Sequence, residues 1–66
     1  MKIRVIERYS KAYSIIDSDI APKVYDRITF NNIPGIYQVI EVIFRVIDLK
    51  FERVDVTIEK IKAPTL

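Results

Sequence analysis

Apolar and polar residues alternate along most of the 66-residue chain. In residues 1–9 one side of an extended backbone carries Ile3, Val5 and Tyr9 with Glu7, and the other carries Lys2, Arg4 and Arg8 with Ile6. A period of two predicts a β-strand, because successive side chains of a strand point to opposite faces. The same alternation predicts strands over residues 24–30 and 54–58. Residues 11–16 form either a second short strand or the continuation of the first.

Three breaks in this pattern predict where the chain turns or bends. Residues 17–23, DSDIAPK, combine turn-forming Asp and Ser with a proline that cannot join a central ladder, so they predict a loop. Residues 31–35, NNIPG, predict a hairpin connection, because Asn and Gly tolerate positive φ and proline presets a turn. The alternation slips by one position within residues 51–54, which indicates a turn or a bulge near Glu52 and Arg53.

Residues 36–49 fit two interpretations. As a helix, the segment would place apolar residues from Ile36 to Ile47 in one stripe, opposite a polar stripe. However, seven of the twelve residues from 36 to 47 are β-branched, which disfavours a helix and suits a strand. We therefore expect a strand over this segment, with the helix as the alternative.

Four to six short strands with hardly any room for a helix predict an all-β fold, a small antiparallel barrel of about five strands. We expect one domain over residues 1–62 and a C-terminal tail over residues 63–66. The stretches YDRITF at 25–30, PGIYQVIEV at 34–42 and ERVDVTIEKI at 52–61 resemble, in their apolar spacing, the strand order of SH3-like small barrels. The resemblance implies a strand, a loop, a bent strand and a final hairpin. It implies no functional residues, because SH3-like barrels include nucleic-acid binders, peptide binders and connector or capsid-associated proteins of viruses.

Composition limits both the core and the chemistry of the chain. In a domain this short, the free energy gained by burial is close to the conformational entropy that folding costs. Thirteen isoleucines and seven valines are more than so small an interior readily encloses, so we expect a partner to cover some of them. The sequence has no cysteine and no histidine, which excludes disulfides, thiolate or imidazole metal ligands and the commonest general base.

The candidate protein interface lies in the long segment, where both faces of a strand would be mainly apolar. One of these faces carries Tyr37, Val39, Ile43 and Ile47. A small barrel buries only its inner face, so these residues predict contact with protein partners or with other copies of the chain. The alternative is a bulge that exchanges the two faces midway and buries both sets inside.

The candidate nucleic-acid surface lies at the basic N-terminus, where residues 1–13 hold four cations and one acid. The cations would contact phosphates, and two tyrosines would stack on bases. The residues concerned are Lys2, Arg4, Arg8, Tyr9, Lys11 and Tyr13. The alternative is a solvated outer strand face whose charges prevent edge-to-edge association. The formal net charge of the whole chain is only +2.

The remaining polar residues form no pattern that predicts catalysis. Asp17, Ser18 and Asp19 lack the further ligands of a calcium loop, so a turn is expected there. Nothing fixes a separation or a cleft for paired acids in the second half of the chain, which are Glu41, Asp48, Glu52, Asp55 and Glu59. A single glycine excludes phosphate-cradling loops. We therefore expect no enzymatic activity, cofactor, metal site or small-molecule substrate.

The expected function is that of a structural or assembly subunit of a larger complex, such as a virion or connector component, that docks through an apolar strand face. The first alternative is a nucleic-acid-binding small barrel that uses the basic N-terminal strand and its tyrosines. A second alternative is a small regulator that occludes an enzyme. No apolar run resembles a secretory signal or a membrane span, so we expect a cytoplasmic location or one within a virion or other large assembly.

Overall fold

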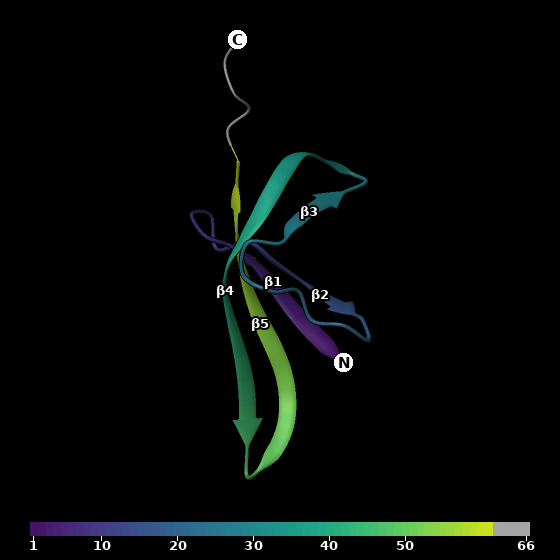
Figure 1. Cartoon of the computed structure of the whole chain (residues 1–66), viewed down its shortest axis with the longest axis vertical. Coiled ribbons are helices and arrows are strands. Elements are labelled where there is room, and N and C mark those ends of the chain that lie inside the picture. The colour runs from purple at the N-terminus through teal and green to yellow at the C-terminus, as the bar shows by residue number, and fades with distance from the viewer. Residues whose placement is uncertain (62–66) are drawn as a thin grey trace.

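The computed structural model describes residues 1–61, which form five β-strands and no helix (Figure 1). The strands are β1 (Lys2–Glu7), β2 (Tyr13–Asp17), β3 (Arg27–Phe30), β4 (Ile33–Ile47) and β5 (Lys50–Lys60). The prediction of an all-β fold with about five strands is confirmed. The predicted tail at residues 63–66 lies outside the described residues. Within residues 1–61 no helix is long and apolar enough to cross a membrane.

All five strands belong to one sheet, in the order β2-β1-β5-β4-β3. The pairs β1–β2, β3–β4 and β4–β5 are antiparallel, whereas β1 and β5 run parallel, with Ile3 opposite Val54. The sheet is therefore mixed, where the sequence predicts a wholly antiparallel one. The reason lies in the connections: the chain reverses direction at each of them, so its first and fifth strands point the same way and can pair only in parallel.

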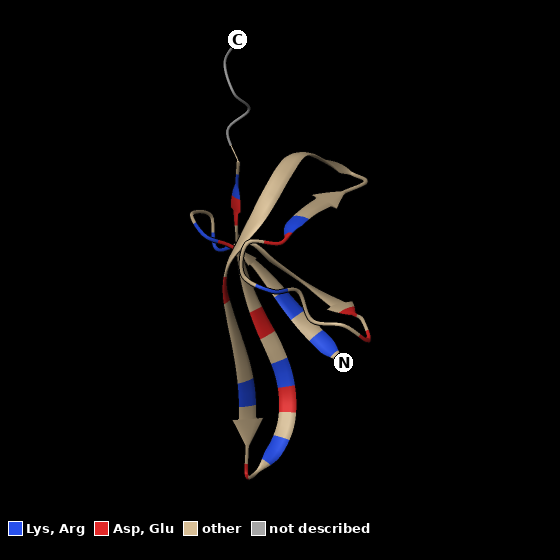
Figure 2. Ribbon diagram, in the orientation of Figure 1, with Lys and Arg blue, Asp and Glu red and all other residues tan. Residues whose placement is uncertain are grey.

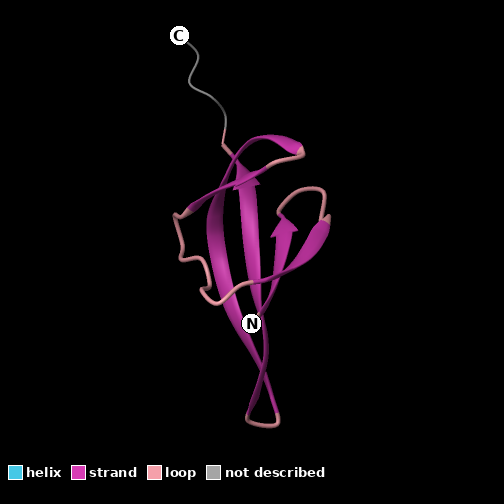
Figure 3. Ribbon diagram, turned by 90° about the vertical axis from the view of Figure 1, so that its right-hand side faces the viewer, coloured by secondary structure: helices cyan, strands magenta, loops and turns pink. Residues whose placement is uncertain are grey.

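The sheet curls into a half-barrel whose edge strands, β2 and β3, do not pair with each other (Figure 3). Its concave face encloses a core of aliphatic side chains from β1, β4 and β5, each at most 3% exposed. The core residues are Ile3, Val5, Val39, Val54, Val56 and Ile58. Phe30 and Tyr37 pack against this core with their rings edge to face, 5.6 Å apart between centroids. The central strands thus supply the core, whereas the edge strands are largely exposed.

The segment that fits both a helix and a strand is the long strand β4. The helix alternative is wrong, because β-branched side chains lose rotamer freedom in a helix and pack well on a pleated sheet. A bulge at Ile40 divides β4, since its register on β5 shifts by one residue between Val39 and Glu41. One extra residue exchanges the faces of the strand. The side chain that packs on the core is therefore Val39 before the bulge and Val42 after it.

The hairpin connection predicted at residues 31–35 is confirmed. Asn31 and Asn32 form the turn between β3 and β4, and the register of the two strands then shifts next to Phe30. Gly35 lies in this irregular stretch with a φ of 107°, which residues other than glycine adopt only with strain. Among residues 31–35 only Gly35 has a positive φ, so the turn at Asn31 and Asn32 does not use the conformation that Asn tolerates.

The turn between β4 and β5 lies at Asp48 and Leu49, within a stretch that the alternation predicts as a strand. Their φ angles are 51° and 62°, a geometry that Asn-Gly pairs usually supply, so neither residue signals it. The slip predicted near Glu52 and Arg53 is a bulge. The register shifts by one residue between Arg53 and Phe51, which leaves Glu52 as the extra residue. The bulge interpretation is therefore confirmed at this site.

Candidate functional site

The distal half of the β4–β5 hairpin projects beyond the other strands (Figures 1 and 3). The pairing of β1 with β5 begins at Val54, so nearer the turn the hairpin has no third strand beside it. Apolar side chains in this part stay exposed: Phe44 by 59%, Val46 by 58% and Phe51 by 50%. Leu49, in the turn, is 99% exposed. We call Phe44, Val46, Leu49 and Phe51 the apolar hairpin surface.

The apolar hairpin surface continues the face that forms the core. Phe44 lies opposite the core residue Val54, and Val46 lies opposite Phe51. Residues directly opposite in an antiparallel pair share a face, and the Phe44 and Phe51 rings lie 6.5 Å apart between centroids. The core face thus extends past the point where β1 ends. Contiguous exposed apolar side chains of this kind are typical of interaction sites.

The four residues predicted as a protein interface do not share one face. Val39 is fully buried in the core, and Tyr37 is half-buried against it. Beyond the bulge at Ile40 the faces are exchanged, so Ile43 and Ile47 lie on the outer face, 37% and 54% exposed. The prediction of one continuous face is thus wrong, because the bulge exchanges the faces. The bulge does not bury both sets inside, since Ile43 and Ile47 stay exposed. Contact of Ile43 and Ile47 with a partner stays a prediction.

Sequence reasoning missed the apolar hairpin surface because its exposure depends on relative strand length. β1 has six residues, whereas β5 has eleven and β4 has fifteen. The six-residue β1 can pair with only part of its longer neighbour β5, and the four-residue β3 can pair with only part of β4. The signal that points to this surface is the difference in length between the alternating segment at residues 1–9 and the long apolar segment.

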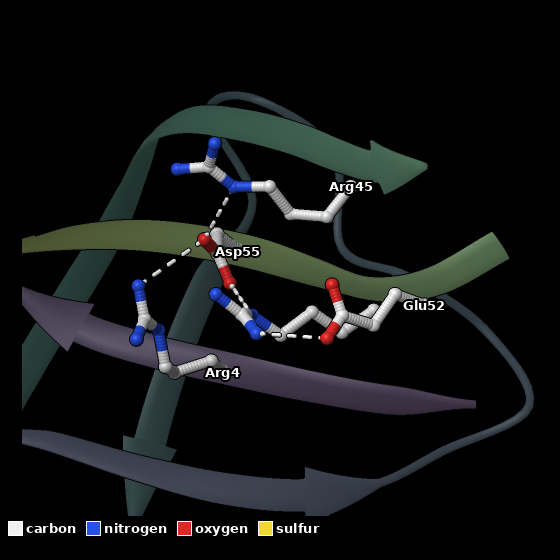
Figure 4. A network of polar contacts seen from close by, with 5 residues as sticks. Arg4, Arg45, Glu52 and Asp55 are labelled. Atoms are coloured by element: carbon white, nitrogen blue, oxygen red, sulfur yellow. Dashed lines mark hydrogen bonds and ion pairs between the residues drawn. The ribbon is translucent and has the colours of Figure 1, made fainter. Parts of the chain in front are cut away.

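On the outer face of the sheet, three arginines surround one buried carboxylate (Figure 4). Asp55 on β5 is 3% exposed. Its Oδ2 accepts a hydrogen bond from Nε of Arg45 at 2.9 Å and another from Nη2 of Arg4 at 3.3 Å. Its Oδ1 accepts a hydrogen bond from Nε of Arg53 at 2.8 Å. Because Arg4 lies on β1 and Arg45 on β4, the carboxylate connects the three central strands.

The charge of Asp55 is stabilised by this arrangement. Burial raises the pKa of the carboxyl. The hydrogen bonds from Arg53 and Arg45 and the positive charge of Arg4 lower this pKa and outweigh the effect of burial. The resulting pKa lies below its ordinary value of 3.8. Asp55 is therefore ionised near neutral pH and fully engaged by arginines. This geometry supports a structural role and gives no general acid.

The candidate nucleic-acid residues lie on three adjacent parts of the chain. Lys2 and Arg4 are on β1, Tyr13 is on β2, and Arg8, Tyr9 and Lys11 are in the turn between these strands. The guanidinium of Arg4 lies 5.5 Å from the ring centroid of Tyr13, while its Nη2 contacts Asp55. Figure 2 shows one basic band of β1 beside an acidic band of β5, and the register identifies this pair as Arg4 and Asp55. Acidic side chains therefore offset part of the positive charge.

Glu59 on β5 contacts the turn end of this surface. Its Oε2 lies 3.5 Å from Nη1 of Arg8, and its Oε1 accepts a hydrogen bond of 2.9 Å from the Tyr9 hydroxyl. This hydrogen bond, together with the negative charge of Glu59, raises the pKa of Tyr9. The guanidinium of Arg8 lies 5.4 Å from the ring centroid of Tyr9. Arg8 and Tyr9 thus come together, as expected, but in contact with a carboxylate.

Glu7 holds the turn between β1 and β2. Its Oε2 accepts hydrogen bonds from the backbone N–H groups of Tyr9 at 2.7 Å and Ser10 at 2.6 Å, and from the Ser10 hydroxyl at 3.0 Å. The bond from the Ser10 backbone is the main cause that lowers the pKa of Glu7. Lys11 follows with a φ of 63°. The single acid of this basic region therefore has a local structural role.

The loop predicted over residues 17–23 is found after β2. Asp17 ends that strand, and the Ser18 hydroxyl both accepts a hydrogen bond from the Ile20 N–H and donates one to the Ile20 carbonyl. Local side-chain turns of this kind are typical of Ser and Asp. The expected turn at residues 17–19 is therefore consistent with the geometry.

A half-open pocket of about 180 Å³ lies on the concave side of the sheet. Its apolar lining includes Val5 and Ile58 from the core and Phe30 and Tyr37 from the β3–β4 hairpin. Glu7 adds a carboxylate that is already bonded within the turn. The pocket therefore marks the gap between the β1–β2 and β3–β4 hairpins, and within its lining the Glu7 carboxylate accepts a hydrogen bond from the Ser10 hydroxyl at 3.0 Å.

The fold and these surfaces define a small all-β half-barrel with one projecting apolar hairpin. Comparison of the chain with family models, with curated proteins and with solved structures finds no match. The function is therefore argued from the geometry of the chain alone.

Proposed function

We propose that the protein is a non-catalytic assembly subunit that docks on another subunit through the distal half of the β4–β5 hairpin. The observation that carries this proposal is the exposure of the apolar hairpin surface where the sheet narrows to two strands. Two-stranded ribbons are marginally stable in water, and exposed apolar side chains gain free energy when a partner covers them. Apolar side chains of β4 and β5 are thus exposed where the hairpin lacks a third layer or strand.

The distal half of the hairpin separates apolar and charged side chains between its two faces. Arg45, Lys50 and Arg53 are on the outer face, opposite the apolar hairpin surface, and Glu52 is the extra residue of the bulge (Figure 2). Interfaces commonly combine an apolar centre rich in aromatic residues with charged residues at the edge. Phe44 and Phe51 would be the aromatic anchors in this case.

The proposal includes an SH3-like relationship for the half-barrel. A curled five-stranded sheet with a bent long strand is compatible with a small barrel of this kind. SH3-like barrels include connector and capsid-associated proteins of viruses, so the proposed setting is a virion or another large assembly. The apolar hairpin surface would then contact either an identical or a different subunit.

The test is the replacement of Val46 by glutamate. Val46 is 58% exposed and lies outside the core, so V46E is expected to keep the β circular dichroism of the wild type. A charge in a desolvated interface is costly, so light scattering should show a clear fall in the mass of the assembly. The matched control is I20E, because Ile20 is 78% exposed in the loop after β2. The proposal would be overturned by a wild-type protein that is monomeric, copurifies with no other protein and has the same mass by light scattering as V46E.

A nucleic-acid-binding barrel is the second proposal, and the two arginine–tyrosine pairs support it. Each pair offers a cation for phosphate and a ring for stacking on a base. Binding of a single-stranded oligonucleotide should then weaken steeply with salt and fall when Lys2 and Lys11 are replaced by glutamate. These lysines are chosen because neither belongs to the Asp55 cluster. Absent or salt-insensitive binding would dismiss this alternative.

A further inference from the structure

The edge strand β2 has few of the features that normally protect the edge of a sheet, and its one charged residue is Asp17 at its end. All five of its residues are exposed, and Ile15 and Ile16 are 60% and 40% exposed. Its sequence, YSIID, contains no lysine and no proline, and its pairing with β1 has no bulge. Lysine, proline and bulges usually protect a free edge, because its unpaired backbone groups can bind other strands.

The other edge strand, β3, is shorter and less regular. β3 has only four residues and begins with the charged Arg27. Its pairing with β4 becomes irregular between Thr29 and Phe30. A short, charged and irregular edge is a poor template for pairing. Of the two edges of the half-barrel, β2 is therefore the one suited to a new strand.

The hydrogen bonds between β1 and β2 show which backbone groups of β2 are free. The Glu7 N–H donates to the Ala12 carbonyl, and the Ser18 N–H donates to the Met1 carbonyl. In an antiparallel pair, the bonding residues of one strand are two apart. The even-numbered residues of β2 therefore bond to β1. The backbone groups of the odd-numbered residues, Tyr13, Ile15 and Asp17, point to the free edge.

We propose that β2 pairs antiparallel with β2 of a second copy of the chain, with Ile15 at the two-fold axis. In this register Ile15 lies opposite its own counterpart, and Tyr13 lies opposite Asp17. All the odd-numbered residues of β2 then meet one another in hydrogen-bonded pairs, each of which exchanges two backbone bonds. The two half-barrels share one continuous sheet, and the two-fold symmetry closes the assembly as a dimer.

Charge and backbone geometry favour this register over its neighbours. An axis at Asp17 would place two carboxylates opposite each other, which is destabilising. An axis at Tyr13 would extend the pairing to Lys11, whose φ of 63° is not that of a strand. The register centred on Ile15 brings together aliphatic side chains at the centre and a hydroxyl with a carboxylate on each side.

This interface goes beyond the docking of the hairpin and does not depend on it. β2 is at one edge of the sheet, whereas β4 and β5 are separated from it by β1. The two associations are therefore measured separately by working in V46E, in which the hairpin contact is removed. Failure of the dimer would leave the effect of V46E on assembly unchanged.

The experiment measures the mass of three proteins by sedimentation equilibrium, all in the V46E background. The protein with native β2 is expected to dimerise. Adding I15K or I15E should give a monomer, because like charges then meet at the axis. An equimolar mixture of I15K and I15E should restore a dimer, since opposite charges meet only if residue 15 faces its counterpart. The control I20K places the same charge in the exposed loop and should leave the dimer intact.

Amide hydrogen exchange gives a test that needs no change in β2. In the dimer, the amides of Tyr13, Ile15 and Asp17 should be protected, and dilution to the monomer should remove this protection. The amides of Ser14 and Ile16 should stay protected in both states, because they face β1. A V46E protein that is monomeric at all concentrations, an I15K protein that still dimerises, or free exchange at Ile15 in a dimer would overturn the proposal.

Discussion

Asp55 shows how single residues stabilise this small sheet. A carboxylate with little access to solvent is costly unless it is paired and hydrogen-bonded. Three arginines from three strands meet this requirement, and each remains at least 31% exposed, so that their own desolvation is modest. The cluster therefore contributes to the stability of the sheet on its outer face, where no apolar layer covers it.

We expect D55N to lower the free energy of unfolding by about 1 to 2 kcal/mol. This is the lower part of the range for bonds between charged groups, because the arginines are partly exposed. Urea unfolding at a fixed protein concentration measures the change. D19N in the exposed loop is the matched control and should have almost no effect. Equal stability of D55N and the wild type would refute a stabilising cluster.

The pH dependence of the free energy of unfolding should reveal the contributions of Asp55 and Glu7. The folded-state pKa values of Asp55 and Glu7 lie below 3.8 and 4.5, so each group stabilises the fold above these values. As the pH falls through the lower folded-state values, protonation removes this contribution. The midpoint of urea unfolding should therefore fall between about pH 5 and pH 2. The fall should be smaller in D55N; an equally steep fall would contradict the assignment.

The turn between β4 and β5 offers a stabilising substitution. Leu49 is 99% exposed and has a φ of 62°, which costs a branched side chain free energy but not glycine. We expect L49G to raise the free energy of unfolding by about 0.5 to 1 kcal/mol. Thermal unfolding monitored by circular dichroism checks this. A lower stability of L49G would contradict this expectation, because it would mean that the Leu49 side chain makes a stabilising contact.

At the scale of elements, two bulges determine which side chains the long hairpin presents. The extra residue Ile40 in β4 turns Val39 into the core and Ile43 outward. The extra residue Glu52 in β5 turns Phe51 to the side of Val46. Without these bulges, the hairpin would present different side chains on both faces.

Shortening the hairpin tests whether its distal half is separate from the folded body. We expect a protein in which residues 46–52 are replaced by Asn-Gly to keep the five-stranded sheet. In this protein Arg45 still lies opposite Arg53, and both still donate hydrogen bonds to Asp55. An Asn-Gly turn closes such a two-residue connection. Circular dichroism should stay β-rich, whereas the assembly mass should fall as in V46E. Loss of folding would show that the tip contributes to the core.

Much of this element structure could be predicted from the sequence. Alternation predicts most strands, β-branched residues decide between strand and helix, and the slip near Glu52 indicates its bulge. The turn at Asp48 and Leu49 could not be predicted, because neither residue has the usual preference for positive φ. The Asp55 cluster was equally hidden, since it brings Arg4 next to a residue of the last strand through a pairing that no local pattern shows.

At the scale of the whole molecule, the two interaction surfaces lie on different strands of one curled sheet. The apolar hairpin surface is on β4 and β5, and the free edge is on β2. The sequence predicts that a chain this rich in isoleucine and valine needs a partner, but it does not show where. The unequal strand lengths and the open half-barrel determine both places, and these are properties of the assembled sheet.

The parallel pairing of β1 with β5 also affects how the chain reaches this state. Residues near position 3 meet residues near position 54, so the central contact spans almost the whole described chain. Forming a contact between such distant residues costs loop-closure entropy before any burial is gained, and β proteins with many such contacts fold on the order of milliseconds to seconds. The β1–β2 ribbon joins the rest of the sheet only when β5 is present. Until then its unpaired edge can mispair with strands of other nascent chains.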